Sequence, residues 1–421
     1  MNRIVKKIVC ISQNILWALK SIFWKKDSSV VLIGAWFGEK FADNSRYLYQ
    51  YLHDNKDKLG LNHVIWVTLN KKVYQQLSEM GYEVYLMDSD ESIEWHKRAK
   101  YHIICNTPYA LNVCDKNGVD HIINGDIMGE LSYRSKRINL WHGTGGLKAV
   151  HMSSNTYKNK KRKHPICYSV IEWLSRNSLI YQKLFREKGG WGDCYQIATS
   201  PLQVSTLRLS YGRKSSKCIV TCYPRNCMCI RLLKEEENII DELKKYEAII
   251  LYLPTFRTNS SFEYSNLSSE MYELLKQKKI LWIEKAHSAE KVNTTSFVHR
   301  PNVIKLNPDF DINVLLPYIT LLITDYSSVR MDAMFHNKAT LFYVPDFEEY
   351  MCGDNGFLAD PNEVMCGPKL KTVQELYEAI DKYIFNPDAS KTPNYQEIRD
   401  RYWSSNKSLA EIWMDIKKQV D

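Results

Sequence analysis

The amino-acid sequence predicts an α/β protein in which two doubly wound, Rossmann-like domains face a cleft, preceded by an amphipathic helix. Three observations support this prediction. The chain has 421 residues, which is too long for one ordinary core and suits two domains of about 200 residues each. Short apolar runs alternate with helical patterns in both halves, as is typical of parallel sheets covered by helices. Residues 1–26 follow a different, purely helical pattern.

Residues 1–26 are predicted to form a helix that associates with membranes. At 100° per residue, ten apolar side chains share one face: Ile4, Val5, Ile8, Val9, Ile11, Ile15, Leu16, Leu19, Ile22 and Phe23. Ser12, Gln13, Asn14 and Lys20 interrupt the apolar run, so a membrane-spanning helix is not expected. A basic amphipathic helix with tryptophans is typical of an interfacial anchor. The alternative is a helix that packs on its own domain.

Residues 27–210 are expected to form the N-terminal domain. Strands are predicted over residues 29–38, 63–69, 82–87, 100–105 and 137–141, with helices over 44–55 and 71–81. Asn44 or Ser45 is the expected cap of the first helix, and Gly81 stops the second. His142 then lies just beyond the carboxyl end of a strand, where open α/β sheets bind ligands.

Residues 211–421 are expected to form the C-terminal domain, with the boundary in the polar stretch around residues 209–217. Strands are predicted over residues 248–257, 279–288, 302–306, 318–328 and 339–345, and a helix over 327–337. The last helix of the chain either stays in this domain or packs back on the N-terminal one.

Charge and cysteine content narrow the classes of ligand. The chain carries 57 Lys and Arg against 48 Asp and Glu, a net charge of +9, which suits an anionic ligand or a membrane surface. The eleven cysteines lack the spacing of a zinc site or a disulfide framework, so no metal site is predicted. Free thiols in a reducing cytoplasm are expected instead.

The stretch "NLWHGTGGLKAV", residues 139–150, is the first candidate site. It joins a strand to a histidine followed by three glycines in four positions. Glycines at such density are typical of tight turns or of close approach between backbone and ligand. His142 is therefore a candidate catalytic residue. The alternative is a plain strand-to-helix turn with an incidental histidine.

Basic and hydroxyl side chains at strand ends of the second half form the other candidate site. In "LLITDYSSVRMD" a strand is followed by Ser327 and Ser328 at the expected start of a helix, where an anion would be favoured. Plain capping by Ser327 is the alternative. Asp325 and Asp332 flank this turn. Further cationic side chains follow other strands: Arg225, Arg257, Lys285 and His287. Together they indicate a diphosphate ligand. "YKNKKRKH", after the glycines, is either a solvated loop or a contact to anionic lipid or a polyanionic acceptor.

These segments resemble one family in combination. "WHGTGGLK", "DNSR", "CYPRN", "LPTFR" and "DINVLLPYITLLITDYSSVRMD" are similar to motifs of the CDP-glycerol glycerophosphotransferases, which include teichoic-acid primases and polymerases. The resemblance runs from about Val30 to the segment "DFEEYMCGDNGF" and beyond. It implies a GT-B fold, a CDP-alditol donor, and peripheral attachment at the cytoplasmic face of the cell membrane.

The resemblance also implies roles for single residues. His142 matches the proposed base of the family and His287 its second essential histidine. Thr324, Ser327 and Ser328 match the donor-phosphate turn of the family. With the strand-end residues, the predicted donor-binding residues of the C-terminal domain are Arg225, Arg257, Lys285, Thr324, Asp325, Ser327, Ser328 and Asp332. Gly143, Thr144 and Lys148 are predicted on the acceptor side, in the N-terminal domain. Two departures stand out: Gly145 and Gly146 replace a usual proline after His-Gly-Thr, and Ser288 replaces the proline after the second histidine.

The expected activity is transfer of glycerol phosphate from CDP-glycerol to a hydroxyl of a lipid-linked or glycan acceptor, with release of CMP. The product would be a teichoic acid or a capsule-type phosphate polymer. No tightly bound cofactor and no nucleic-acid partner are expected, and Mg²⁺ beside the diphosphate stays open. CDP-ribitol transfer, a nucleotide-sugar glycosyltransferase of GT-B type and a non-catalytic polyanion-binding protein are the alternatives.

Overall fold

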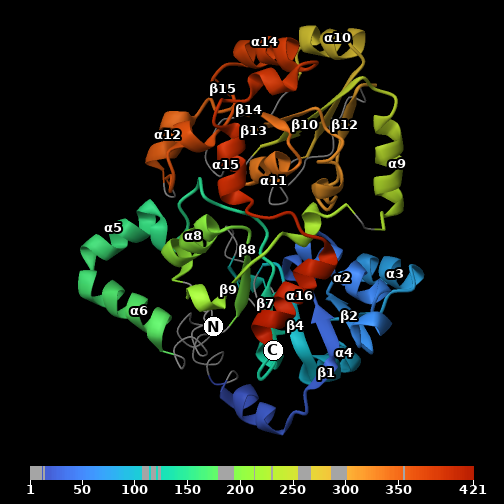
Figure 1. Cartoon of the computed structure of the whole chain (residues 1–421), viewed down its shortest axis with the longest axis vertical. Coiled ribbons are helices and arrows are strands. Elements are labelled where there is room, and N and C mark those ends of the chain that lie inside the picture. Colours follow the sequence, from blue (N-terminus) through green and yellow to red (C-terminus); the bar gives the residue numbers. More distant parts are fainter. Residues whose placement is uncertain are drawn as a thin grey trace. The chain divides into compact units, whose positions relative to one another are not determined.

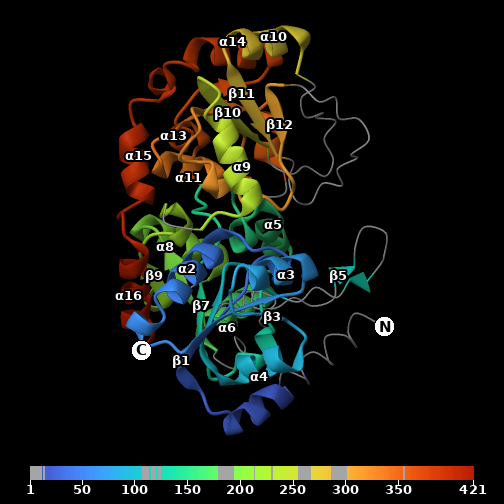
Figure 2. The same ribbon diagram turned by 90° about the vertical axis from the view of Figure 1, so that its right-hand side faces the viewer.

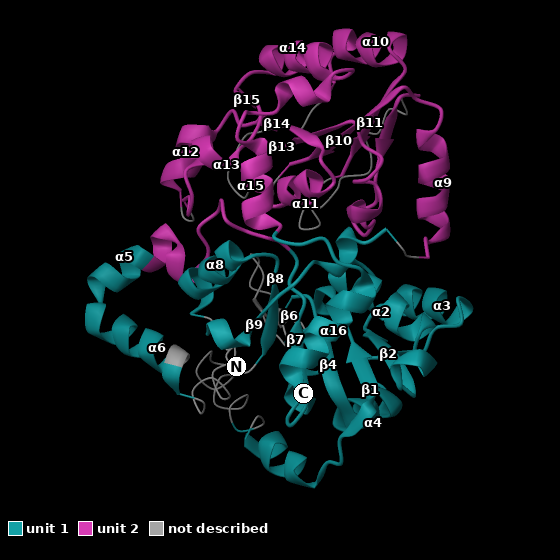
Figure 3. Cartoon of the chain, in the orientation of Figure 1, with its two compact units in different colours: residues 1–142, 158–230, 404–421 teal, residues 143–157, 231–403 magenta. Residues whose placement is uncertain are grey.

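The computed structural model describes residues 12, 15–106, 113–114, 120–121, 125–178, 194–212, 214–228, 231–254, 267–285, 301–353 and 356–421. The chain forms two compact units (Figure 3). Unit 1 contains residues 1–142, 158–230 and 404–421, and unit 2 contains residues 143–157 and 231–403. Neither unit is therefore one continuous stretch of chain.

Unit 1 is built on a parallel sheet. Within the described residues, seven strands follow the order β3-β2-β1-β4-β7-β8-β9 (Figures 1 and 2). Their bounds are β1 Asp27–Ile33, β2 His63–Thr68, β3 Val84–Leu86, β4 Ala99–Ile104, β7 Lys136–Asn139, β8 Tyr195–Ala198 and β9 Cys218–Val220. A short antiparallel pair, β5 Val113–Cys114 and β6 Asp120–His121, stands apart from this sheet.

Helices accompany the sheet of unit 1. They are α2 Asp43–Asp54, α3 Lys71–Glu79, α4 Asp90–Arg98, α6 Pro165–Asn177, α8 Pro201–Tyr211 and α16 Leu409–Val420, while α5 Asn155–Lys163 crosses the boundary between the units. Strand β1, an interior strand of the sheet, ends in a run of fully buried residues, Val30 to Ile33. Such continuous apolar runs are typical of parallel strands that are covered on both faces.

Unit 2 repeats this architecture with a different sequence. Its parallel sheet has, within the described residues, the order β12-β11-β10-β13-β14-β15. The strands are β10 Ala248–Leu253, β11 Ile280–Glu284, β12 Val303–Lys305, β13 Leu321–Thr324, β14 Ala339–Tyr343 and β15 Lys369–Leu370. The helices are α9 Lys234–Leu243, α10 Ser269–Gln277, α11 Val329–Phe335, α12 Phe347–Cys352, α13 Pro361–Val364, α14 Val373–Tyr383 and α15 Tyr395–Tyr402. Trp282 and Ile250 lie in its buried core.

The predicted fold class is confirmed, because both units are parallel α/β structures, but the boundary at residues 210 and 211 differs from the observed units. Strand β9, which lies beyond that boundary, pairs with β8 in the sheet of unit 1. Helix α16 also belongs to unit 1, as the second of the two predicted placements of the last helix has it, and there Asp415 accepts a hydrogen bond from the Thr221 hydroxyl at 2.6 Å. Conversely, residues 143–157 leave unit 1 and belong to unit 2.

One local prediction, the cap of the first helix, differs from the structure. Helix α2 begins at Asp43, with Ala42 as its cap and no capping side chain, so Asn44 and Ser45 lie inside the first turn. Both residues are buried, and the Asn44 side chain bonds to the backbone of Trp141 and Arg225 instead of capping the helix. Much of the predicted helix 1–26 lies outside the described residues, although residues 15–20 are helical. Among the described residues, no helix combines the length and the apolar character that crossing a bilayer requires.

Candidate functional site

His142 lies at the carboxyl edge of the sheet of unit 1, three residues after β7. Its Nδ1 atom is 3.0 Å from the backbone oxygen of Cys105, which follows the neighbouring strand β4. A carbonyl oxygen only accepts hydrogen bonds, so Nδ1 carries the proton and donates. In the neutral imidazole Nε2 then holds the free lone pair, which is what a general base requires.

Two indole rings surround this imidazole. The ring of Trp141 lies 4.4 Å from that of His142, and the ring of Trp36 lies 5.4 Å away. Both tryptophans have left-handed backbone conformations, with φ of 45° for Trp36 and 60° for Trp141. Such conformations are costly for bulky residues and concentrate at functional sites. Burial lowers the pKa of His142 below its ordinary value.

A buried ion pair supports the backbone of His142. Nη1 of Arg225 lies 2.6 Å from Oδ1 of Asp43 and donates a second hydrogen bond to the carbonyl oxygen of His142 at 2.9 Å. Both charged side chains are almost fully buried. Burial has the largest influence on the pKa of His142. Of the two charges, that of Asp43 raises this pKa and that of Arg225 lowers it. The two charges therefore act on His142 in opposite directions.

Asn44 completes this arrangement. Its Nδ2 atom donates to the backbone oxygen of Trp141 at 2.8 Å, and its Oδ1 atom accepts from the backbone N–H of Arg225 at 3.1 Å. The predicted motifs "DNSR" and "CYPRN" thus meet the strand end at Trp141 and His142 within unit 1. Arg225, which the sequence analysis placed in the C-terminal domain with the donor-binding residues, lies instead beside His142, because the chain around it contacts α2.

Asp126 is a buried residue of this site that the sequence analysis missed. Its carboxylate accepts backbone hydrogen bonds from Phe37 at 2.9 Å, Cys105 at 2.9 Å and Asn106 at 2.7 Å. Burial raises the pKa of Asp126 to about 7, and the three N–H donors act against this shift. The carboxylate therefore fixes the loops after β1 and β4, including the carbonyl that orients His142. The segment "NGDIMGE" has no periodicity or motif that would have signalled this role.

The glycine-rich segment after His142 belongs to unit 2. A Cβ atom on Gly143 would lie only 2.7 Å from the Oγ atom of Ser328, so this close approach requires glycine. Gly146 has a φ of 94° and adjoins the ring of Tyr402. The segment then pairs with residues 356–358, since the N–H of Leu358 donates to the oxygen of Leu147 at 2.7 Å. The predicted close approach therefore involves side chains of unit 2.

Two further predicted acceptor-side residues also lie in unit 2. The Oγ1 atom of Thr144 is buried without a hydrogen-bond partner in the described part of the chain. A buried hydroxyl without a partner is uncommon and is a candidate for ligand contact. The backbone of Lys148 forms an isolated antiparallel β-bridge with that of Phe357, and the Nζ atom of Lys148 lies 5.8 Å from the ring centre of Tyr350. Gly143, Thr144 and Lys148 thus lie in the same unit as most of the predicted donor-binding residues.

The predicted donor-binding residues that the structure describes in unit 2 follow two of its strands. Lys285 comes directly after β11, and the turn from Thr324 to Ser328 follows β13. Parallel strands end at the same edge of a sheet, and only β10 separates these two. Nζ of Lys285 donates to the oxygen of Phe310 at 2.6 Å, and the Thr324 hydroxyl donates to the oxygen of Leu253 at 2.5 Å.

The serine turn has a defined shape. Ser328 is the N-cap of α11 but makes no capping hydrogen bond, while Oγ of Ser327 accepts from the N–H of Val329 at 3.4 Å. Between Asp325 and Ser327, the ring of Tyr326 stacks on that of Tyr350 at 3.9 Å. Asp325 and Asp332 are both buried. Arg257 and His287 lie outside the described residues. In the part of the chain that is described, no group of three or more His, Cys, Asp or Glu side chains is arranged to hold a metal ion.

A family model described as CDP-glycerol:poly(glycerophosphate) glycerophosphotransferase matches residues 16–410. The teichoic acid poly(glycerol phosphate) polymerase of Bacillus spizizenii is 25% identical over 375 residues, which cover 85% of this chain and 84% of the relative. The teichoic acid glycerol-phosphate transferase of Staphylococcus aureus is 22% identical, with 89% of each chain covered. The match to the poly(glycerol phosphate) polymerase of Bacillus subtilis, 24% identical, covers 91% of this chain but 48% of the relative.

The fold also has a solved counterpart. The wall teichoic acid polymerase TagF superposes with a TM-score of 0.67 and 18% identity, over 99% of this chain and 97% of the TagF chain. At this identity the likeness concerns the fold, and it agrees with the two parallel α/β units described above.

Proposed function

The chain belongs to the CDP-glycerol:poly(glycerophosphate) glycerophosphotransferase family, and from this membership we propose that it transfers glycerol phosphate from CDP-glycerol to a hydroxyl of an acceptor and releases CMP. The relatives named above act in teichoic acid synthesis by their names, so we propose a teichoic acid polymer or its lipid-linked precursor as the acceptor. The observation that carries the proposal is the imidazole of His142, which the Cys105 carbonyl holds in place within the family motifs.

The proposed chemistry uses Nε2 of His142 as the general base. The acceptor hydroxyl attacks the phosphorus next to glycerol and gives its proton to Nε2 while the new O–P bond forms. The P–O bond to the CMP phosphate breaks, and CMP leaves with the bonding electrons. Because Cys105 holds the Nδ1 proton in place, the imidazole enters the reaction in the required tautomer. Negative charge develops on the leaving oxygen of CMP, so hydrogen-bond donors and cations that contact the CMP phosphate lower the barrier.

Donor binding is proposed for the strand ends of unit 2. Lys285, Thr324, Ser327 and Ser328 lie along one edge of its sheet, and Asp325 and Asp332 flank the serines. Arg257 and His287 are proposed for the same role from the family motifs alone. A variant with Ser327→Ala and Ser328→Ala is expected to bind CMP several-fold more weakly in calorimetry, with Ser269→Ala on α10 as a matched control. A dissociation constant within twofold of the parent would exclude the serines as donor ligands.

Comparing CMP release from different CDP-linked donors identifies the alditol that the enzyme transfers. We expect acceptor-dependent release of CMP from CDP-glycerol and little from CDP-ribitol or CDP-choline. Faster release from CDP-ribitol would identify a ribitol phosphotransferase instead, and turnover of a UDP-sugar would identify a glycosyltransferase. No tightly bound cofactor is part of the proposal, and chelation with EDTA tests whether Mg²⁺ accompanies the diphosphate.

Peripheral attachment to the cytoplasmic face of the membrane is part of the proposal, and two exposed apolar surfaces support it. Near the N-terminus, Leu19 is 58% exposed and Phe23 is 89% exposed, beside the exposed Lys20 and Lys25. On α6, Ile166, Val170 and Trp173 are 81%, 51% and 61% exposed. Their spacing of four and three residues places them on one helix face, directly after the basic residues 158–163. Apolar side chains next to cations favour the surface of anionic lipid.

A further inference from the structure

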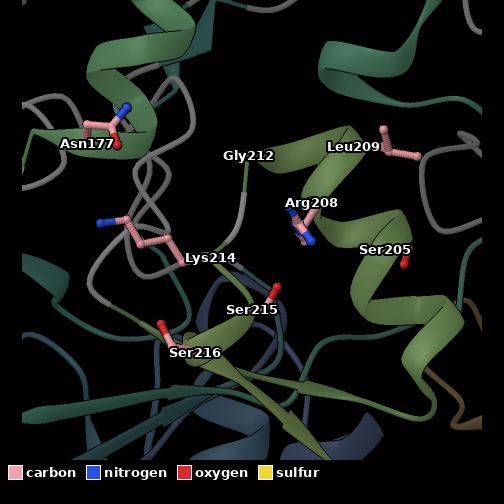
Figure 4. A pocket seen from close by; sticks show the side chains of 8 residues that line it. All are labelled: Asn177, Ser205, Arg208, Leu209, Gly212, Lys214, Ser215 and Ser216. Atoms are coloured by element: carbon pink, nitrogen blue, oxygen red, sulfur yellow. The ribbon is translucent and has the colours of Figure 1, made fainter.

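A cavity of about 660 Å³ lies in unit 1, between the last turns of α8 and the segment that leads into β9 (Figure 4). In Figure 4, Ser205 and Arg208 project from α8, and Lys214, Ser215 and Ser216 come from the segment after it. None of the residues in the catalytic arrangement of His142 lines this cavity. Its volume falls within the range of sites for small organic ligands and exceeds what one phosphate ion fills.

The local sequence explains why polar side chains face the cavity. Ser205, Arg208 and Gly212 recur at intervals of three and four residues, so they share one face of α8. Leu207 and Ser210 point the other way and are buried. Gly212 ends the helix in the left-handed conformation, with φ of 65°. This turn reverses the chain, so that the segment from Lys214 onward lies opposite the helix.

The charge of the cavity is positive and uncompensated. Within the part of the chain that the structure describes, neither the Arg208 guanidinium nor the Lys214 ammonium group has an ion-pair partner, and no acidic residue is among the described lining residues. Some surface lysines of this unit do have an ion-pair partner, such as Lys161 with Glu172 at 2.9 Å. Two unpaired cations with serine hydroxyls around them favour a ligand that carries phosphate and hydroxyl groups.

We infer that this cavity binds phosphodiester groups of the acceptor, so that a glycerol phosphate chain is held there by Arg208 and Lys214 while its terminal hydroxyl reacts at His142. The inference rests on the proposed function. A series of ring contacts within unit 1 connects the cavity to His142. Tyr211, next to the lining residue Gly212, lies 5.1 Å from the ring of Trp141, which in turn lies 4.4 Å from that of His142. An acceptor with several repeats would reach both.

Direct titration tests the inference without any chemistry. A synthetic glycerol phosphate oligomer is titrated into the full chain in the absence of donor, at low and at physiological salt. We expect the variant with Arg208→Gln and Lys214→Gln to bind about tenfold more weakly, and salt to weaken parent binding more than variant binding. Lys72→Gln, the same change on an exposed lysine of α3, is the matched control and is expected to bind like the parent. Thermal unfolding confirms that each variant is folded.

Two results of this titration would overturn the inference. The first is an oligomer affinity of the double variant within twofold of the parent. The second is equal affinity of the parent for the oligomer and for poly-glutamate of the same charge, because the cavity would then respond to charge alone. Arg208→Lys retains the charge but not the planar group and is expected to lie between the parent and the double variant.

Steady-state kinetics separate this inference from the proposed function. The double variant is expected to raise KM for the oligomeric acceptor about tenfold, while KM for CDP-glycerol and kcat at saturating acceptor stay close to the parent values. Failure of the parent to release CMP with any acceptor would reject the proposed function, whereas the titration would still decide whether the cavity binds the oligomer. An unchanged acceptor KM in an active double variant would reject the cavity as an acceptor site.

Discussion

The Nδ1 atom of His142 donates a hydrogen bond to the backbone oxygen of Cys105 at 3.0 Å, and the backbone N–H of the same Cys105 donates to Asp126 at 2.9 Å. One residue therefore connects the proposed base to a fully buried carboxylate. Asp126 acts on His142 through this connection, so it is a positioning residue.

Replacement of His142 by alanine is expected to abolish transfer and to leave donor affinity nearly intact. The imidazole takes the proton only during the reaction, and loss of a general base costs on the order of 100- to 10,000-fold in rate. Single-turnover transfer and titration with CDP-glycerol measure the two effects separately. Transfer by His142→Ala at nearly the parent rate would reduce the histidine to a turn residue. By contrast, His287→Ala is expected to impair both donor binding and rate.

The acid limb of the pH–rate profile is expected to have its midpoint below 6.5. Burial lowers the pKa of His142 from the ordinary value of 6.5, so the base stays neutral into mildly acidic solution. The same lowered pKa decides how the free energy of unfolding changes with pH. The unfolded chain binds the proton at higher pH than the folded chain, so the free energy of unfolding falls as the pH drops from 6.5 toward the folded pKa. His142→Gln should make this fall smaller, and urea titrations between pH 5 and 8 measure it.

Removal of one partner from the buried pair of Asp43 and Arg225 is expected to destabilise unit 1 strongly. Asp43→Asn leaves the guanidinium without its counter-charge, which typically costs about 3–5 kcal/mol. Asp43→Leu with Arg225→Met removes both charges and is expected to recover part of this loss without recovering activity. Denaturant unfolding and CMP release provide the two measurements. A double variant less stable than Asp43→Asn would contradict the proposed origin of the loss.

Gly143→Ala is expected to destabilise unit 2, because its methyl group would lie 2.7 Å from Oγ of Ser328. Overpacking of this kind typically costs about 1–3 kcal/mol. Adding Ser328→Gly removes the hydroxymethyl group and should restore much of the unfolding temperature. The opposite result, a double variant with a lower unfolding temperature than Gly143→Ala alone, would show that the strain arises elsewhere.

Deletion of residues 1–26 is expected to weaken binding to anionic vesicles and leave the rest of the chain folded. The exposed Leu19 and Phe23 would otherwise enter the interfacial region of the bilayer. Co-sedimentation at physiological salt measures the change. The variant with Ile166→Lys and Trp173→Glu tests α6 in the same assay, and Tyr74→Lys on α3 is its matched control. If vesicle binding is unchanged in the deletion and in the α6 variant, neither surface anchors the chain.

The sequence predicted the parallel architecture and the elements around the site because its strands are short apolar runs with turn residues at their ends. It also predicted that His142 and the serine turn closely follow strands, since each comes after such a run. It did not predict that Arg225 pairs with Asp43, because two charges 182 positions apart carry no local signal. Asp126 was missed for the same reason: its role depends on three backbone N–H groups from two separate loops.

The predicted domain boundary differs from the observed units for another physical reason. Residues 209–217 read as a polar linker between the domains, yet β9 follows them directly and Ile219 is buried there through pairing with β8. Pairing between separate strands, rather than local composition, decides where a unit ends. The glycines after His142 were predicted to allow close approach of the backbone, but the sequence did not indicate that Ser328 and Tyr402 are the neighbouring groups.

The division of unit 1 into three segments has a consequence for the order of synthesis on the ribosome. Residues 404–421 supply α16, and the Asp421 carboxylate accepts a hydrogen bond from the hydroxyl of Tyr101, on the central strand β4, at 2.7 Å. Domains generally fold as they emerge, starting from the N-terminal end. Here the first unit to emerge lacks its final helix until all of unit 2 has been translated, which leaves the apolar face that Trp413 and Ile416 cover exposed during that interval. Nascent chains arrested before residue 404 are therefore expected to bind chaperones that hold apolar surfaces, and release should follow once α16 has emerged.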